Sequence, residues 1–267
     1  MKHTYYSKTE ERVLQELAEF QYLTSSQFVR LGLTKTRKGI YPVLQKLSGG
    51  AKPEIGKINY NVNPVHGRPE TVFYLTTKGA KHLIQQHGYE ESAIKRPKRS
   101  SVSFASDYYH RVWTVDFFIG IKLWCIEEGY TLRYFSYYFQ QSGGSNRNNK
   151  GGKSLADNRI DVGSGGIGYI IPDGVFIVDR PDQKPIFGLF EQHNGKDTAK
   201  FLRQVYAHTQ AMLEGAPSIQ YNVKYEGEYV GNRVYCQFEH QSCLKAVKYK
   251  LDKSVDFEVF SSNFKFL

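Results

Sequence analysis

The basic residues of this chain are concentrated in its first 102 positions, which divides the sequence into two modules of different character. Residues 1–102 contain 17 of the 36 lysines and arginines but only 8 of the 26 aspartates and glutamates, whereas residues 103–267 are nearly balanced. Almost all of the formal charge of +10 therefore belongs to the first module. A small basic module is typical of polyanion-binding proteins, because lysine and arginine near phosphates release condensed counterions. The alternative is a basic surface that only keeps the protein in solution.

The composition indicates a folded cytoplasmic protein with no membrane partner. Of its 267 residues 40% are hydrophobic, which is enough to build real cores. The most apolar run, residues 112–126, is interrupted by Asp116 and Lys122, and the N-terminus lacks the apolar segment of a signal peptide. Three cysteines without a CxxC pair predict reduced thiols rather than a disulfide framework or a zinc site.

The first module has the helix order of a helix-turn-helix domain. Apolar spacing predicts three helices, over residues 8–20, about 25–31 and about 35–47. Thr24 or Ser25 can cap the second helix and Thr34 the third, while Gly32 separates them. Pro42 leaves the start or straightness of the third helix open.

The start of the third helix is the expected DNA-reading segment, because the second helix of a helix-turn-helix points its N-terminal side chains into the major groove. The expected DNA-contacting residues there are Lys35, Thr36, Arg37, Lys38 and Tyr41. Two predicted strands follow, over 55–62 and 72–75, and the turn between them carries Arg68 at its tip, as a wing would.

A further helix through about His87 completes a predicted winged-helix DNA-binding domain at residues 1–89. The alternative is a small helical domain whose basic face only meets water. Residues 90–102 have no periodicity and hold four basic side chains, which predicts a linker.

The second module, residues 103–267, is predicted to be an α/β domain. A helix is expected over 104–128, an aromatic strand over 130–139 and a flexible loop over 140–168. Two glycine-rich motifs in this loop resemble phosphate-binding loops, but neither has the required context. The Walker-like residues 151–154 lack the first glycine, and the GxGxxG at 163–168 leads into a strand rather than a helix.

Two carboxylates mark the candidate active site of this module. The predicted strands 170–178 and 185–193 form a hairpin that carries Asp173 and ends in Glu191 and His193. Adjacent strands can bring two carboxylates close enough to hold Mg²⁺, with Mn²⁺ as a substitute, and the ion would polarise a phosphodiester. The alternative is that Asp173 only begins an Asp-Gly turn.

The order of elements then resembles the restriction-endonuclease-like core with its PD-(D/E)xK motif. A helix over 198–213 and a strand over 218–225 follow the hairpin. Asp173 and Glu191 take the acidic positions of the motif, and His193 stands where the lysine is expected. We therefore expect an α+β protein with an N-terminal winged helix-turn-helix and a nuclease-like α/β domain, with Asp173, Glu191 and His193 as candidate catalytic residues.

Taken together, the chain resembles the replication-relaxation family, which includes mobilisation relaxases of plasmids. The matching segments are the winged-helix region, 110–116, 172–176, 190–191, Lys200 and Tyr206. The resemblance implies recognition of double-stranded DNA of a plasmid or mobile element and nicking at an origin of transfer or replication. The chain departs from the family after Glu191, where 192–195 replace the expected charged pattern.

Three functions remain open on the sequence alone. The first is a DNA-binding protein with Mg²⁺-dependent endonuclease or relaxase activity. The second is a non-enzymatic transcription or copy-number regulator whose second domain serves for homodimerisation or partner binding. The third is an RNA-binding or defence nuclease, because aromatic sheets can stack single-stranded bases. A tyrosine-nucleophile relaxase is disfavoured because the eight histidines form no His-apolar-His triplet, so Tyr108, Tyr109 and Tyr206 are expected in the core or in stacking.

Overall fold

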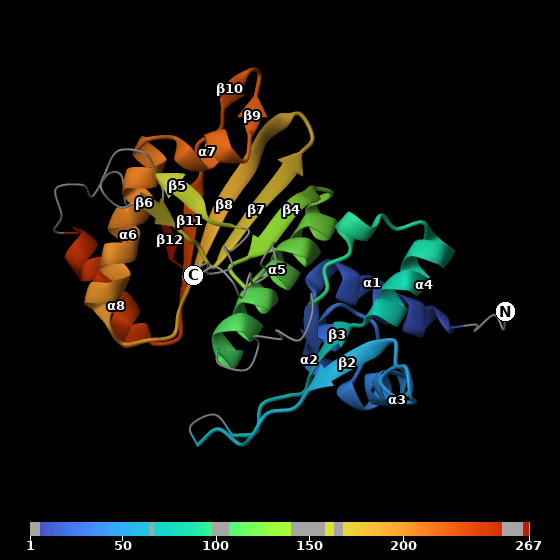
Figure 1. The fold of residues 1–267 in the computed structure, drawn as a ribbon. Coiled ribbons are helices and arrows are strands. Elements are labelled where there is room, and N and C mark those ends of the chain that lie inside the picture. Colours follow the sequence, from blue (N-terminus) through green and yellow to red (C-terminus); the bar gives the residue numbers. More distant parts are fainter. Residues whose placement is uncertain are drawn as a thin grey trace, which may run out of the picture. The chain divides into compact units, whose positions relative to one another are not determined.

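The computed structural model is a mixed α+β structure (Figure 1). It describes residues 6–64, 67–97, 107–139, 158–162, 168–252 and 264–266. The chain separates into two compact units, Met1–Ile119 and Gly120–Leu267, called here the N-terminal and the C-terminal unit. The division falls inside helix α5 (Tyr108–Glu128), whereas the sequence led us to expect it after residue 102.

Contacts with helix α2 explain why the first half of α5 belongs to the N-terminal unit. The Gln27 side chain donates hydrogen bonds to the Val112 carbonyl (3.1 Å) and to Asp116 Oδ1 (3.3 Å). Arg30 donates to the Asp116 carbonyl (3.0 Å) and pairs with its carboxylate (3.3 Å). Burial raises the pKa of Asp116, an effect that these two partners oppose.

The predicted helices of the N-terminal unit are confirmed. They are α1 (Lys8–Phe20), α2 (Ser25–Arg30), α3 (Arg37–Leu47) and α4 (Thr77–His87). Each begins after a hydroxyl residue whose oxygen accepts a hydrogen bond from the third helical N–H, which satisfies one of the free donors at the helix start. Thr24 is the cap of α2. The cap of α3 is Thr36 and not Thr34, whose hydroxyl donates instead to the Thr36 carbonyl (2.9 Å).

A three-stranded antiparallel sheet accompanies these helices, in the order β1-β3-β2. Its strands are β1 (Tyr22–Thr24), β2 (Ile55–Ile58) and β3 (Val72–Leu75). The sequence did not predict β1, because three residues between two helices are too few to show an alternating pattern. Apolar side chains from the sheet and from α1, α3 and α4 form the core of the unit, and α1 contributes Val13, Leu14 and Leu17 with no exposed area.

Gly79, the third residue of α4, allows a close approach between this helix and the residue before β2. A Cβ atom at Gly79 would lie 2.4 Å from the Glu54 carbonyl oxygen. That carbonyl is fixed, since it accepts hydrogen bonds from the Thr76 N–H (3.0 Å) and hydroxyl (2.9 Å). We expect Gly79→Ala to lower the free energy of unfolding by about 1–3 kcal/mol, measured by urea denaturation with circular dichroism.

Gly39 provides the matched control, because it is also the third residue of its helix and also donates to the capping threonine (3.2 Å). The nearest atom to a Cβ there is 3.5 Å away. Gly39→Ala should be neutral or stabilise the protein by up to about 1 kcal/mol, because alanine favours a helix. Equal destabilisation by both substitutions would contradict the steric explanation.

The C-terminal unit contains a five-stranded sheet in the order β12-β11-β8-β7-β4. Its strands are β4 (Thr131–Tyr137), β7 (Gly174–Arg180), β8 (Gln183–His193), β11 (Arg233–Phe238) and β12 (Phe264–Phe266). Strand β7 pairs antiparallel with both β4 and β8, whereas β8, β11 and β12 run parallel to one another. The parallel step from β8 to β11 requires a crossover, and helix α6 (Thr198–Leu213) provides it.

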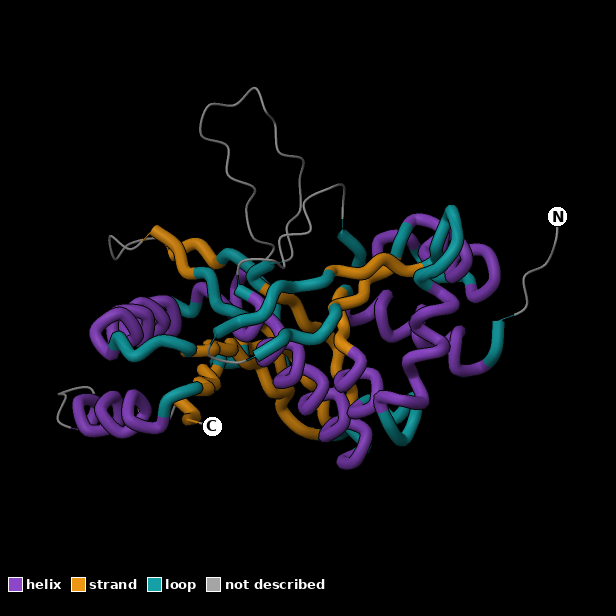
Figure 2. Tube along the Cα trace, turned by 90° about the horizontal axis from the view of Figure 1, so that it is seen from below, coloured by secondary structure: helices purple, strands orange, loops and turns teal. Residues whose placement is uncertain are grey.

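Helix α6 and helix α8 (Gln241–Asp252) lie side by side (Figures 1 and 2). Their apolar side chains join one core cluster with the odd-numbered residues Val175 and Ile177 of β7 and Phe187 and Leu189 of β8. Side chains alternate along a strand, so these residues identify the face of the sheet that meets the helices. This face is called here the helix-covered face.

Several sequence predictions for this unit are confirmed and one is wrong. The hairpin of β7 and β8 and helix α6 are present, and the turn is shorter than expected because Arg180 already pairs with Gln183. The strand predicted over 218–225 is wrong: residues 216–220 form helix α7 (Ala216–Gln220), with Pro217 in its first turn. Only Lys224–Tyr225 is extended there, as β9, which pairs with β10 (Glu228–Tyr229).

Part of the predicted loop 140–168 forms a small hairpin of β5 (Ile160–Val162) and β6 (Gly168–Ile170). The Walker-like residues 151–154, most of the GxGxxG segment and the end of the linker at 98–102 lie outside the described residues. Within the described ranges, no helix combines the length and the apolar character needed to cross a membrane.

Candidate nucleic-acid interface and carboxylate site

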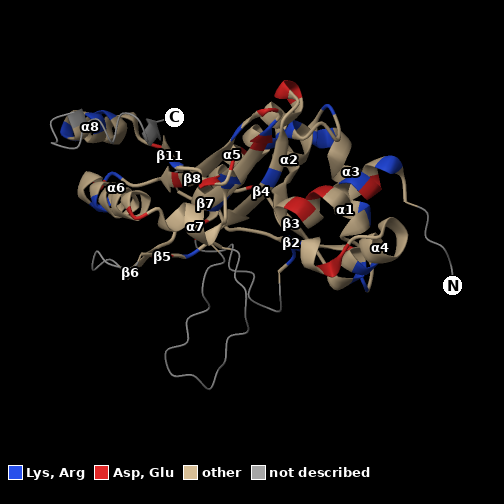
Figure 3. Cartoon of the chain, turned by 90° about the horizontal axis from the view of Figure 1, so that it is seen from above, with Lys and Arg blue, Asp and Glu red and all other residues tan. Residues whose placement is uncertain are grey.

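The start of α3 presents its predicted DNA-contacting residues to solvent. Lys35, Thr36, Arg37 and Lys38 are all exposed, and the Tyr41 side chain, one turn further along, is 55% exposed. Figure 3 shows the lysines and arginines of this helix in blue. The Gln45 amide donates a hydrogen bond to the Tyr41 hydroxyl (2.7 Å), which holds the ring in place on the exposed side of the helix.

Most of these cations have no acidic partner in the described part of the chain. Among the described residues no ion pair is found for Lys35, Lys38 or Arg68. Arg37 pairs with Glu70 at 3.4 Å, but its side chain is 61% exposed. Such an exposed pair contributes little to stability, so Arg37 can exchange Glu70 for another anion at small cost.

The hairpin between β2 and β3 continues well beyond the two strands. The pairing of Ile58 with Val72 extends in register to Asn63 and Gly67, whose backbones exchange two hydrogen bonds (2.7 and 2.9 Å). Arg68 lies exposed immediately after this bridge. The two residues at the turn, 65 and 66, lie outside the described residues.

Glu70 fixes the base of this hairpin to the start of α2. Its carboxylate accepts hydrogen bonds from the Ser25 hydroxyl (2.6 Å) and from the Ser26 N–H (3.0 Å) and hydroxyl (2.5 Å). Burial acts to raise the pKa of Glu70, but these hydrogen bonds and the nearby Arg37 outweigh it and lower the pKa. The backbone N–H of Glu70 donates to the Tyr108 hydroxyl (2.9 Å). The base of the hairpin is therefore held by hydrogen bonds to the Glu70 carboxylate and not by packing alone.

The two candidate carboxylates of the C-terminal unit lie at neighbouring positions, as the sequence predicted. Asp173 directly precedes β7, and the pairing of Gly174 with Phe190 places Asp173 opposite Glu191. Asp173 Oδ2 accepts a hydrogen bond from the Gln192 N–H (2.8 Å). Both side chains share the odd-numbered register of the helix-covered face, and Cys236 of β11 pairs with Glu191 in the same row.

Glu191 is buried and already has a partner in helix α6. Its side chain is 5% exposed, and its Oε1 lies 2.5 Å from His208 Nε2. Burial lowers the pKa of His208 to about 4, an effect that the negative charge of Asp173 partly opposes. At neutral pH the imidazole is thus neutral and donates its Nε2–H to the carboxylate. Burial together with Glu191 and Asp173 also raises the pKa of the Cys236 thiol, which makes it unreactive.

His193, at the position of the missing lysine, is part of an aromatic cluster. It is 7% exposed, and its ring lies 5.1 Å from that of Phe201 and 5.5 Å from that of Phe238, measured between centroids. The structure therefore brings Asp173, Glu191 and His193 to one face of one sheet, with His193 held by packing on α6 and β11.

The sequence did not identify His208 as a member of this site. Its position carried a usable signal, because residues 201, 205 and 208 recur at helical spacing on the buried side of α6. That spacing places His208 on the buried side of α6. Two of the tyrosines that were expected in the core or in stacking differ from each other. Burial raises the pKa of Tyr108. Tyr206 is 57% exposed and does not belong to the core.

Comparison of the chain with protein-family models, with curated proteins and with solved structures gives no significant match.

Proposed function

We propose that this protein binds double-stranded DNA through a winged helix-turn-helix in its N-terminal unit. The observation that carries the proposal is the element order α1-β1-α2-α3-β2-β3 with the sheet order β1-β3-β2, together with exposed cations at the start of α3. In this arrangement α3 would enter the major groove with Lys35, Thr36, Arg37, Lys38 and Tyr41. The β2–β3 hairpin would follow the backbone with Arg68.

The distribution of charge supports this orientation. Residues 25–69, from α2 to the hairpin, contain eight lysines and arginines and one acidic residue, Glu54. Glu54 is turned to other partners, because its carboxylate pairs with Lys78 and accepts a hydrogen bond from Tyr6 (2.7 Å). The hairpin extends five residues beyond Ile58 to the bridge at Asn63, a reach of roughly 17 Å, which is enough to contact the backbone beside the groove.

We further propose that the C-terminal unit has a restriction-endonuclease-like fold and that the DNA is an origin of transfer or replication on a plasmid or mobile element. The order α5-β4-β7-β8-α6-β11 of the main-sheet strands and the longer helices, with Asp173 directly before β7 and Glu191 on β8, supports the fold. The resemblance to the replication-relaxation family supports the DNA target. Asp173 and Glu191 would hold Mg²⁺ or Mn²⁺, which would polarise a phosphodiester and activate water.

One observation favours the non-enzymatic alternative, in which the C-terminal unit serves for dimerisation or partner binding. Glu191 is buried and hydrogen-bonded to His208, and Asp173 accepts the Gln192 N–H, so both carboxylates already have partners. Incubation of the protein with supercoiled plasmid and Mg²⁺ or Mn²⁺ distinguishes the enzyme from the non-enzymatic alternative. Nicking by the wild type that is lost in Asp173→Asn supports the enzyme, whereas intact plasmid, or nicking that survives the substitution, rejects it.

The DNA-binding proposal is tested by titrating the whole protein with labelled duplex at several salt concentrations. We expect binding in dilute buffer. The logarithm of the association constant should fall linearly with the logarithm of the salt concentration, with a slope of about −0.9 for each phosphate contacted. Single-stranded DNA and RNA competitors should displace the duplex poorly. Failure to bind duplex in dilute buffer, or preference for RNA, would reject the proposal.

A further inference from the structure

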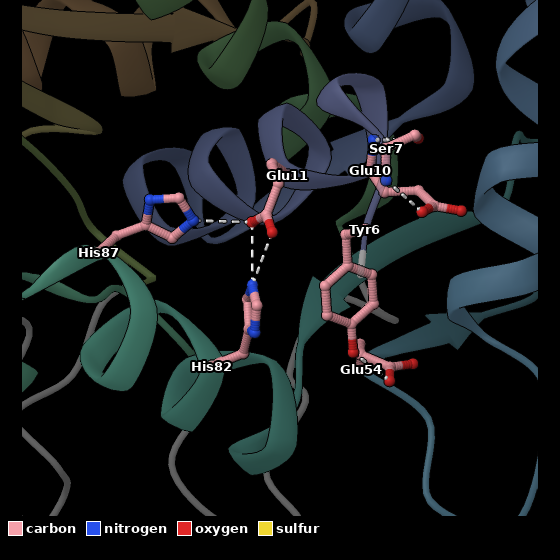
Figure 4. Close-up of polar contacts among 7 residues, drawn as sticks. All are labelled: Tyr6, Ser7, Glu10, Glu11, Glu54, His82 and His87. Carbon is pink, nitrogen blue, oxygen red and sulfur yellow. Dashed lines mark hydrogen bonds and ion pairs between the residues drawn. The ribbon is translucent and has the colours of Figure 1, made fainter. Parts of the chain in front are cut away.

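Two histidines and one glutamate of the N-terminal unit converge on a single point (Figure 4). His82 Nε2 lies 2.9 Å from both carboxylate oxygens of Glu11, and His87 Nε2 lies 2.9 Å from Glu11 Oε2. Glu11 belongs to α1, and both histidines belong to α4. Within the described residues, this is the group of three whose ligand atoms all lie within 4.8 Å of one another.

The arrangement has the chemistry of a metal site and is only partly exposed. The side chains of Glu11, His82 and His87 are 22%, 14% and 31% exposed, so water can reach the cluster from the His87 side. Two imidazole nitrogens and one carboxylate oxygen are the donors of three-ligand zinc sites, which keep a fourth position for water. A tetrahedral ion separates its donors by about 3.4 Å, so each Nε2 needs to move only about 0.5 Å away from the Glu11 oxygen that it now contacts.

Neighbouring residues orient the ligands. The Tyr6 ring packs edge-on against His82, with centroids 4.5 Å apart, and the Tyr6 hydroxyl is fixed by its hydrogen bond to Glu54 (2.7 Å). His87 is the last residue of α4 and precedes Gly88, whose left-handed backbone (φ 66°) ends the helix. His82 and His87 are five residues apart on one helix, about 140° around its axis, yet both side chains reach the same carboxylate, and their ring centroids lie 5.8 Å apart.

We propose that Glu11, His82 and His87 form a binding site for a divalent transition metal of the zinc class, which fastens α4 to α1. Without the ion, each Nε2–H donates a hydrogen bond to Glu11, because a carboxylate can only accept. Binding requires a free Nε2 lone pair, so a neutral imidazole transfers its proton to Nδ1 through solvent and a protonated one releases a proton. Imidazole donors favour Zn²⁺, Co²⁺, Ni²⁺ and Cu²⁺ over Mg²⁺ and Ca²⁺.

The test uses the full chain, free of affinity tag and stripped with a chelator, and adds Zn²⁺ during calorimetry and thermal unfolding. We expect one Zn²⁺ per chain with a Kd on the order of 1 µM or tighter, and no comparable binding of Mg²⁺. Saturation should raise the unfolding temperature of the N-terminal unit by roughly 5 °C, because the ion binds only the folded state. Co²⁺ should give the intense visible absorption of a four-coordinate site.

The variants His82→Gln/His87→Gln and Glu11→Gln should each weaken Zn²⁺ binding on the order of 100-fold and remove the cobalt spectrum. Glu16→Gln is the matched control, because it makes the same change on the same helix outside the cluster, and it should bind Zn²⁺ like the wild type. Circular dichroism confirms that each variant is folded, and Glu11→Gln serves if the double variant is not. Absence of Zn²⁺ binding by the wild type, or unchanged affinity in the folded variants, overturns the proposal.

Discussion

Replacing His208 by phenylalanine is expected to lower the free energy of unfolding of the C-terminal unit by about 3–5 kcal/mol. The substitution keeps a ring of similar size in the core but leaves the Glu191 carboxylate, 5% exposed, without its partner at 2.5 Å. A buried charge that loses its partner keeps its full desolvation cost. The measurement is urea denaturation of the full chain, with hydrogen exchange of α6 and β8 to assign the loss to this unit.

A double-mutant cycle separates the pair from the packing. His208→Phe/Glu191→Leu removes both polar partners together, so it should be more stable than His208→Phe alone, with a coupling energy of roughly 1–3 kcal/mol. Tyr206→Phe on the same helix, at a side chain that is 57% exposed, should change stability by less than about 0.5 kcal/mol. Additive effects of the two substitutions would show that the hydrogen bond does not hold this part of the sheet.

The lowered pKa of His208 predicts that the free energy of unfolding depends on pH. The pKa of His208 is about 4 in the folded protein and 6.5 for the ordinary side chain, so the unfolded chain takes up the proton first as the pH falls. Its contribution to stability is therefore complete above pH 6.5 and is lost as the pH falls toward 4. We expect the wild type to lose about 3 kcal/mol more than His208→Phe/Glu191→Leu over this interval, as judged by denaturation at each pH. Parallel pH profiles would contradict a buried neutral His208.

The local signals in the sequence were sufficient for most helices. The bounds predicted for α6, residues 198–213, agree with the structure, because Asp197 caps the start and the apolar spacing is regular. The strand expected over 218–225 was wrong because the prediction gave more weight to its apolar residues than to the glycine and the proline that precede it. Gly215, with a left-handed backbone (φ 67°), and Pro217 in the first turn begin a short helix instead.

The candidate sites depend on distant contacts that a single sequence does not encode locally. The motif predicted that Asp173 and Glu191 would be neighbours, since a hairpin fixes the register of its strands. The partner of Glu191 arises only when α6 packs across the sheet and brings His208 over the end of β8. Likewise, Glu11 and His82 are 71 residues apart, and their approach depends on how α4 packs on α1.

The substitution Arg37→Ala/Lys38→Ala is expected to weaken duplex DNA binding by about 10- to 100-fold near physiological salt and to make the salt slope shallower by about 2. Both side chains are exposed at the start of α3, and their removal leaves the capping Thr36 and the buried face of the helix intact. Glu70 keeps its hydrogen bonds to Ser25 and Ser26, so the hairpin stays anchored. The unfolding temperature should therefore remain that of the wild type.

Lys8→Ala/Lys81→Ala is the charge-matched control, because it removes two exposed lysines from α1 and α4 of the same unit. A general electrostatic attraction would make both double variants equally weak, whereas an interface at α3 weakens only the first. If Arg37 also reads a guanine in the cognate site, Arg37→Ala alone should cost about 1–3 kcal/mol of specific binding and little of the non-specific binding. Equal losses in the two double variants would place the DNA elsewhere on the basic unit, and a normal affinity of Arg37→Ala/Lys38→Ala would remove α3 from the interface.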